Sequence, residues 1–148
     1  MKEEYQTLLD KINAIVDPAL PLVSNLANIS SILFELEDVN WAGFYLSNKE
    51  YLYLGPFQGE VACTKIPFSK GVCGHAYSSE ATVIVDNVNE FKGHIACSTK
   101  SKSEIVTPIF KDNEVIGVID IDSPRYSRFT KEEQELLEEI SKVIAGLQ

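Results

Sequence analysis

Residues 105–124, IVTPIFKDNEVIGVIDIDSP, contain the pattern that decides the fold of this chain. Two apolar runs with a two-residue period flank the pair Asp112–Asn113, which tolerates the left-handed backbone of a tight turn. The stretch therefore predicts an antiparallel β-hairpin. Alternation along its second strand places Asp120 and Asp122 on the same face of the sheet.

Five further segments upstream predict the rest of the sheet, as four strands, and one helix that covers it. A two-residue period with short intervening turns is typical of antiparallel strands, and glycines and serines bound the helical segment. The expected strands are NWAGFYL (40–46), YLYLGPF (51–57), VACTKIP (61–67) and TVIV (82–85), and the expected short helix is SKGVCGHAYSSE (69–80).

Both ends of the chain have apolar residues at helical spacing, which predicts amphipathic helices within 1–38 and 130–148. The last of these begins with a capping box, Thr130 to Glu133. We expect these terminal helices to pack together against one sheet face, or against a second copy of the chain. The 148 residues contain no internal repeat or linker, so we expect a single α+β domain over 1–148.

Composition excludes several classes of partner. The net charge of −9 disfavours nucleic acid and anionic membrane surfaces, which attract basic proteins. The charged N-terminus lacks the apolar core of a signal peptide, and no run is long enough to span a membrane. Three widely spaced cysteines are an odd number for a disulfide framework. We therefore expect a cytoplasmic protein whose cysteines are inert or catalytic thiols and do not form a structural disulfide framework.

The loop before the hairpin is the best candidate for an active site. It includes FKGHIACSTKSKSE, residues 91–104, whose one glycine and three serines are residue types of turns and caps. A loop of this length in a small domain is usually functional. It places Cys97 in a polar setting close to the acidic strand.

Three chemical interpretations of the cysteines compete with simple burial. Cys63 alternates with Val61 in an expected strand, and Cys73 lies in a glycine-flanked segment, so both thiols could be packing residues. A metal site could combine the three cysteines with a histidine, but close Cys-x-x-Cys pairing is missing. A cysteine hydrolase is disfavoured because neighbouring carboxylates oppose thiolate formation. His75 and His94 are more typical of structural histidines than of acid–base catalysts.

Redox chemistry accounts for more of these residues at once. One thiol attacks, a second resolves the resulting sulfenic acid, and an acid protonates the departing oxygen. Cys97 is the candidate for the first thiol, with Cys63 or Cys73 as the second. Carboxyl groups crowded into a dry pocket cannot all ionise, so one of them should stay neutral and donate a proton. The candidates for that acid are Glu104, Asp120 and Asp122.

The motifs together closely resemble the free methionine-(R)-sulfoxide reductases, which are built on a GAF domain. The resemblance runs from about Trp41 to Phe129. It rests on NWAGFYL, LGPFQGEVACTKIPFSKGVCG, GHIACSTKSKSEIVTPI and GVIDIDSP, with all three cysteines in the expected order. It implies a six-stranded antiparallel sheet with helices on its faces, and a homodimer.

The resemblance also implies an activity. Free L-methionine (R)-S-oxide would be reduced to L-methionine, with thioredoxin as the recycling reductant and no metal, flavin or nucleotide cofactor. Cys97 resembles the attacking cysteine, Cys63 the resolving cysteine that forms a disulfide with it, and Cys73 an auxiliary cysteine.

Five further positions complete the site that the resemblance implies. Glu104, Asp120 and Asp122 look like the acids that bind substrate and protonate its oxygen, and Trp41 and Tyr45 like the aromatic wall around the methyl–sulfur end. Taken alone, the two aromatic residues would also suit a core. The competing class is a non-enzymatic GAF sensor of a small molecule or of redox state, which the lack of an output domain disfavours.

Overall fold

The computed structural model describes residues 1–94 and 100–148, and a six-stranded sheet forms its centre. The order is β3-β2-β1-β6-β5-β4, and each neighbouring pair runs antiparallel, as the sequence predicted. The strands are β1 (Trp41–Ser47), β2 (Tyr51–Gly59), β3 (Lys65–Pro67), β4 (Val83–Val85), β5 (Ser103–Lys111) and β6 (Glu114–Ser123).

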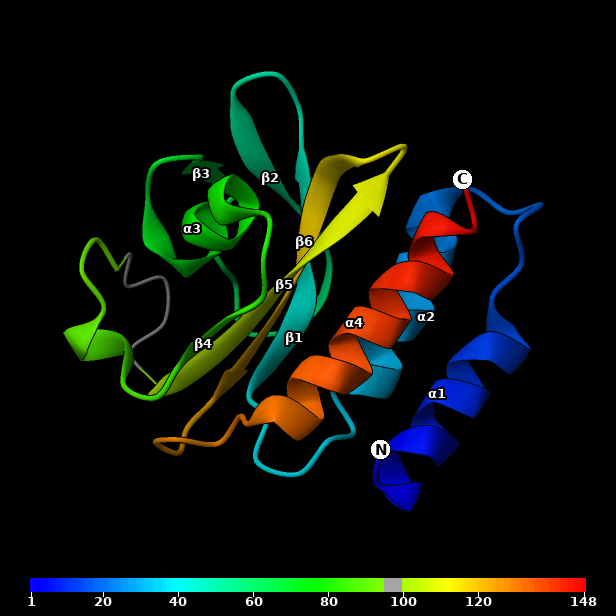
Figure 1. The fold of residues 1–148 in the computed structure, drawn as a ribbon, viewed down its shortest axis with the longest axis horizontal. Helices are drawn as coiled ribbons and strands as arrows, with labels where there is room; N and C mark the ends of the chain where they lie inside the picture. The colour runs from blue at the N-terminus through cyan, green and yellow to red at the C-terminus, as the bar shows by residue number, and fades with distance from the viewer. Residues whose placement is uncertain (95–99) are drawn as a thin grey trace.

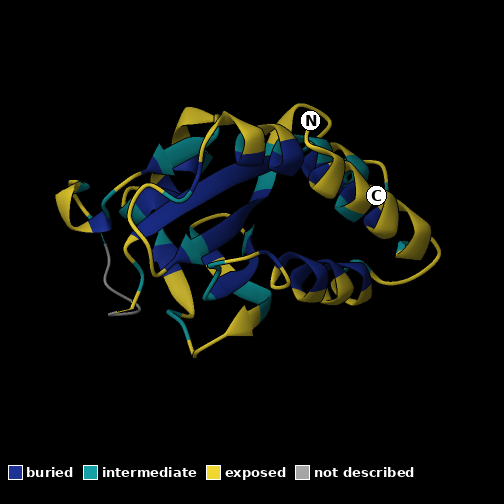
Figure 2. Ribbon diagram, turned by 90° about the horizontal axis from the view of Figure 1, so that it is seen from below, coloured by how far each residue is buried: buried dark blue, intermediate teal, exposed yellow. Residues whose placement is uncertain are grey.

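Helices cover both faces of the sheet (Figures 1 and 2). Three of them lie on one side and α3 lies on the other, together with the loops around it. Their bounds are α1 (Glu3–Ile15), α2 (Leu22–Leu33), α3 (Gly71–Ser79) and α4 (Lys131–Ala145), with a short 3₁₀ turn η1 (Val88–Glu90). No helix in the described part of the chain is long and apolar enough to cross a membrane.

The predicted hairpin separates the two cores of the molecule. Asp112 and Asn113 have positive φ values of 51° and 67° at the β5–β6 turn. Along β6, Ile119 and Ile121 face the core beneath α1, α2 and α4, whereas Val118 belongs to the core beneath α3. The strict alternation of a strand therefore turns the neighbouring acids, Asp120 and Asp122, toward α3.

A buried polar contact joins the two terminal helices. The Tyr5 hydroxyl of α1 donates a hydrogen bond to Glu133 in the first turn of α4. Arg128 pairs with the same carboxylate at 3.3 Å, and Thr130 completes the expected capping box with it.

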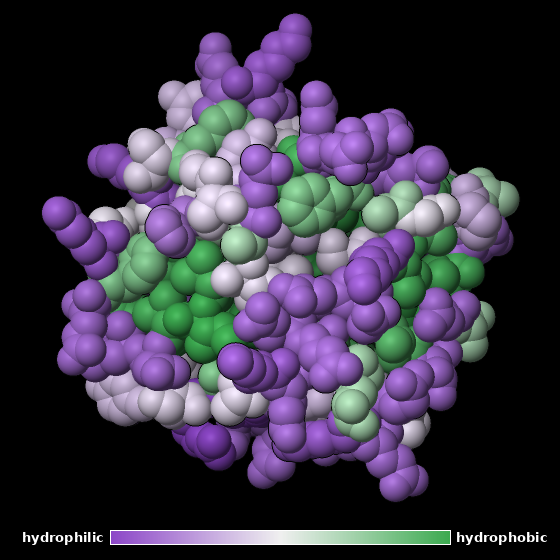
Figure 3. Space-filling view, viewed as in Figure 1, coloured by the Kyte–Doolittle hydropathy of each residue, from purple (hydrophilic) through white to green (hydrophobic). Residues whose placement is uncertain are grey.

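The face of the molecule shown in Figure 3 is mostly hydrophilic, with apolar patches between the charged side chains.

Two boundaries differ from the sequence prediction. The third strand does not begin at Val61, because β3 contains only Lys65–Pro67 and the Val61 side chain is 88% exposed. Cys63 therefore lies in a connection and not in a strand. Conversely, Glu104 was expected at the end of a loop but lies in β5, where it pairs with Asp122 of β6.

Candidate functional site

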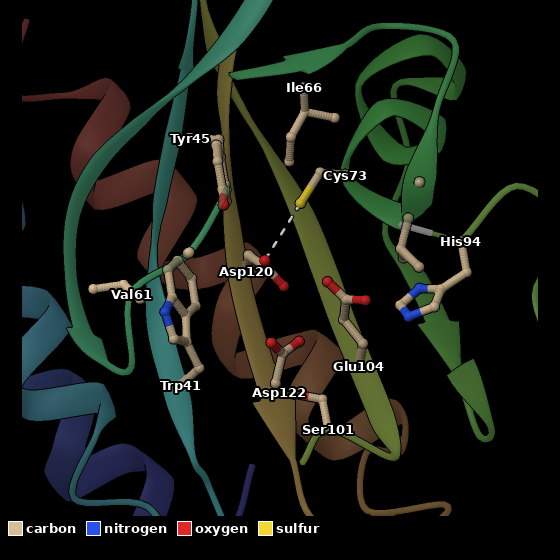
Figure 4. Close-up of a pocket in the computed structure, with 13 residues that line it drawn as sticks. Trp41, Tyr45, Val61, Ile66, Cys73, His94, Ser101, Glu104, Asp120 and Asp122 are labelled. Atoms are coloured by element: carbon tan, nitrogen blue, oxygen red, sulfur yellow. Dashed lines mark hydrogen bonds between the residues drawn. The ribbon is translucent and has the colours of Figure 1, made fainter. Parts of the chain in front are cut away.

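A pocket opens on the α3 face of the sheet, and it collects most of the predicted site residues (Figure 4). Strands β1, β5 and β6 supply its floor, the connection after β2 and the start of α3 supply its walls, and His94 closes one side. The lining residues are Trp41, Tyr45, Val61, Ala62, Ile66, Gly71, Val72, Cys73, His94, Ser101, Glu104, Asp120 and Asp122.

Strand register brings the acids together. Asp122 lies opposite Trp41 on one side and opposite Glu104 on the other, so these three form a continuous row across β1, β6 and β5. Asp120 faces Gly43 in the next row of the same face. Since directly opposed residues have Cβ atoms about 4.5–5.5 Å apart, three carboxyl groups share one small space.

Burial changes the protonation of these acids. It raises the pKa of Glu104 and of Asp122 well above the ordinary range, and the charge of Asp120 raises both further. Burial also raises the pKa of Asp120, but hydrogen bonds from Glu104, Cys73 and Asp122 oppose that effect. The pKa of Asp120 is thus raised less than those of Glu104 and Asp122, so Asp120 is the acid of the three most suited to carry the negative charge, and the other two favour the neutral form.

Two oxygen atoms of this cluster have no partner among the described residues. They are the Oδ1 atoms of Asp120 and Asp122, both buried. Asp120 as a whole is only 5% exposed. A buried acceptor without a donor costs free energy, so this arrangement is suited to a ligand that brings hydrogen-bond donors.

Cys73 contacts the acids from the opposite wall. Its Sγ atom donates a hydrogen bond to Asp120 Oδ2 at 3.4 Å. Burial raises the pKa of the Cys73 thiol, and the charges of Asp120 and Glu104 raise it further. The thiol is therefore neutral, which makes Cys73 a poor nucleophile and a hydrogen-bond donor to the acid cluster.

Cys73, Glu104 and Asp120 also bring a sulfur and two oxygens within 4.8 Å of one another. A thiolate and two carboxylates are donors that zinc accepts. Binding zinc would require the removal of protons that burial favours on Cys73 and Glu104. The protonation of this cluster opposes a resident metal.

Two aromatic side chains form the wall facing Cys73 and also hold the connection after β2. Trp41 Nε1 donates to the Glu60 carbonyl at 3.0 Å, and the Tyr45 hydroxyl donates to the Cys63 carbonyl at 2.8 Å. Burial raises the pKa of Tyr45, and the charge of Asp120 adds to it, so the hydroxyl stays protonated. The backbone of Cys63 is thereby fixed at the pocket edge.

The three cysteines have different positions. Cys63 is disulfide-bonded, and Cys73 is a free, buried thiol. Cys97, the predicted nucleophile, lies outside the described residues. The structure therefore brings Trp41, Tyr45, Cys73 and the three acids into one pocket, with Cys63 in the connection that forms part of its wall.

His94 is a pocket residue that the sequence interpretation treated as structural. Its side chain lies beside Glu104, on the opposite side of the pocket from Trp41 (Figure 4). Burial lowers the pKa of His94, and the charge of Asp120 opposes that effect. His94 lies in a loop whose sequence has no periodicity, and only its proximity in sequence to Cys97 indicated a role.

Comparison with known proteins identifies the family of the chain. The GAF domain family profile matches residues 21–146. The free methionine-R-sulfoxide reductase of Escherichia coli is 44% identical over 97% of this chain and 90% of its own length. The Saccharomyces cerevisiae protein of the same name is 46% identical over 97% of this chain and 85% of its own length.

A solved structure has the same architecture. The free methionine-R-sulfoxide reductase of Neisseria meningitidis, crystallised with its substrate, superposes with a TM-score of 0.93 at 38% identity, covering 99% of this chain and 91% of that one. The profile match and these similarities extend over nearly the whole chain and include the strands that hold the acids. The chain belongs to the GAF domain family, within the group of free methionine-R-sulfoxide reductases.

Proposed function

We propose that this protein reduces free L-methionine (R)-S-oxide to L-methionine in the cytoplasm, with thioredoxin as the final reductant. The observation that carries the proposal is the acid cluster, in which two neutral carboxyl groups adjoin one that holds the negative charge. A sulfoxide needs a proton at its oxygen as the S–O bond breaks, and the ammonium of a free amino acid needs an anion. One small pocket offers both.

In the first step, the Cys97 sulfur attacks the sulfoxide sulfur. Glu104 or Asp122 gives its proton to the sulfoxide oxygen, which develops negative charge as the S–O bond weakens. The net change moves one oxygen atom from the substrate to Cys97. The thiol becomes a sulfenic acid, and the sulfoxide leaves as the thioether of methionine.

In the second step, Cys63 condenses with the sulfenic acid. A disulfide forms between Cys63 and Cys97, and the oxygen leaves as water. The hydrogen bond from Tyr45 to the Cys63 carbonyl supports this step, because it keeps the resolving residue at the pocket edge. Thioredoxin, a dithiol, then reduces the disulfide by exchange and returns both cysteines to thiols.

Substrate recognition follows from the arrangement of the walls. Asp120 carries the charge that suits an ammonium group and has a free buried oxygen directed into the pocket. Trp41 and Tyr45, with ring centroids 6.0 Å apart, offer an apolar surface to the methyl–sulfur end. A methionine within a peptide lacks the ammonium, so it would leave Asp120 without a partner.

We further propose that the protein works as a homodimer. Three exposed apolar side chains between the end of α1 and the start of α2 support this, because a patch of exposed apolar surface is typical of a protein–protein interface. They are Ile15, Leu20 and Val23.

The division of labour between the cysteines is tested by single-turnover chemistry. Reduced protein is mixed with free methionine sulfoxide, each diastereomer separately, and the methionine released per chain is counted. Cys97→Ser should release none, because the attacking sulfur is gone. Cys63→Ser should release about one equivalent of methionine from the (R)-sulfoxide and then stop. Equal loss in both variants would refute the assigned roles, and binding without turnover by the unaltered protein would favour a sensor.

A further inference from the structure

The acids of the pocket complement the ammonium of a free amino acid but not its carboxylate. A free amino acid is a zwitterion, and its carboxylate is repelled by a site that holds Asp120 as an anion. Either the carboxylate stays in solvent or a second part of the pocket binds it. If the whole substrate is buried, the pocket must bind the carboxylate, because an unpaired buried charge is costly.

The side of the pocket formed by His94 and the start of α3 has the opposite character. Gly71 and Val72 occupy the first turn of the nine-residue helix α3 and line the pocket together with His94. The N-cap residue, Lys70, makes no side-chain cap. The N-terminal end of a helix attracts anions through its free N–H groups and its dipole.

One hydrogen bond fixes His94 beside that helix end. The Gly71 N–H donates to the Gly93 carbonyl at 3.0 Å, and both glycines have positive φ values, 70° and 84°. Glycine adopts this backbone without strain, so the loop can turn tightly against α3. The residue that follows Gly93 is His94, and its ring lies on the pocket side of this junction (Figure 4).

The remaining side-chain donors of the described lining are already engaged. Trp41 donates to the Glu60 carbonyl and Tyr45 to the Cys63 carbonyl. Ser101 acts on Asp122, whose pKa its hydrogen bond lowers. An independent sign that the pocket takes a ligand is Asp120, which is almost fully buried and has an oxygen without a partner.

From this geometry we propose that His94 and the first turn of α3 bind the carboxylate of the free amino acid, while Asp120 binds its ammonium. His94 is then the residue that determines specificity for a free carboxyl end, and it extends the function proposed above. The two charged groups of the substrate are held from two walls, β6 and α3. A peptide bond at the carboxyl end would place a neutral amide where the site offers N–H donors to a carboxylate.

The test compares two substrates on one protein preparation. L-Methionine (R)-S-oxide and its carboxamide differ only at the carboxyl group. We take the ratio of kcat/KM for the free acid to kcat/KM for the carboxamide, which does not depend on the fraction of active protein. In His94→Ala the ratio should fall by roughly tenfold to a hundredfold, because the free acid loses a charge-assisted hydrogen bond and the amide does not. His94→Gln retains an N–H donor and should give an intermediate ratio.

His75→Gln is the matched control. His75 is the other histidine of the chain, it is exposed on α3, and it lies outside the pocket lining. The ratio in this variant should equal that of the unaltered protein. If the ratio in His94→Ala stays within about twofold of the unaltered value, or if both substrates lose activity equally, His94 does not bind the carboxylate. If the unaltered protein fails to turn over the free acid, the proposed reaction itself is wrong.

Discussion

Replacing Asp122 by Asn should slow the reaction and stabilise the fold. Both effects have one cause, because the Asn side chain has no ionisable proton. Asn has nearly the same shape as the neutral acid that burial favours at this position. It can donate a hydrogen bond to the sulfoxide oxygen but cannot transfer a proton. General acid catalysis contributes roughly 10²- to 10⁴-fold, so kcat should fall by an amount in that range if Asp122 is the acid, with a smaller change in KM.

The effect on stability depends on pH. The native pKa of Asp122 is raised, so below the unfolded value of about 3.9 both states carry the proton and the group contributes no difference. As the pH rises above that value, the unfolded chain releases its proton while the native pocket retains it. Each unit by which the native pKa exceeds the unfolded one then costs the fold about 1.4 kcal/mol. Asn removes this cost.

Two measurements on reduced protein check this reasoning. Denaturant unfolding at a series of pH values should show Asp122→Asn gaining stability over the unaltered protein between about pH 4 and neutrality, and no pH-dependent gain below that range. Steady-state kinetics of the same samples should show the lower kcat. If Asp122→Asn is less stable at neutral pH and the unaltered protein grows more stable with rising pH, the carboxyl is ionised in the pocket. The proton donor would then have to be another group.

Two further substitutions test contacts outside the acid cluster. Tyr45→Phe removes the hydrogen bond to the Cys63 carbonyl, so steady-state turnover should fall while the single-turnover yield of methionine is preserved; loss of that yield would mean that the hydroxyl acts on the substrate. Tyr5→Phe removes the donor to Glu133 and should cost about 1.5–3 kcal/mol of unfolding free energy at neutral pH. Burial raises the pKa of Glu133, but this and other hydrogen bonds outweigh burial and lower it. The loss of unfolding free energy in Tyr5→Phe should therefore shrink as the pH falls below about 4 and the carboxylate takes up a proton. A loss that stays constant with pH would contradict the role of the carboxylate.

Local patterns were sufficient to predict the central hairpin of the sheet. The two-residue period of 105–122 and the Asp112–Asn113 turn predicted the hairpin, and alternation placed Asp120 and Asp122 on one face. The sequence misplaced Glu104 because serine and lysine residues precede it, which are typical of a loop. Its pairing with Asp122 depends on the register of two strands, which local patterns do not show.

The other differences have tertiary causes. Residues 61–64 have the alternation of a strand but are held by side-chain bonds from Trp41 and Tyr45 to their backbone and to Glu60. His94 has no periodic context, and its place in the pocket depends on the contact between Gly71 and Gly93. Both cases involve partners more than fifteen residues apart in sequence, which a single sequence without relatives cannot pair.

The two faces of the sheet have unequal covers. Helices α1, α2 and α4 seal one side with a continuous apolar core, whereas the other side has α3, of nine residues, above a pocket lined by acids. A small molecule held between α3 and the central strands adds its binding energy to the attachment of that helix. Substrate binding should therefore strengthen the packing of α3 against the sheet, whereas the three-helix side, which the pocket does not reach, contributes its apolar core to the stability of the domain in either state.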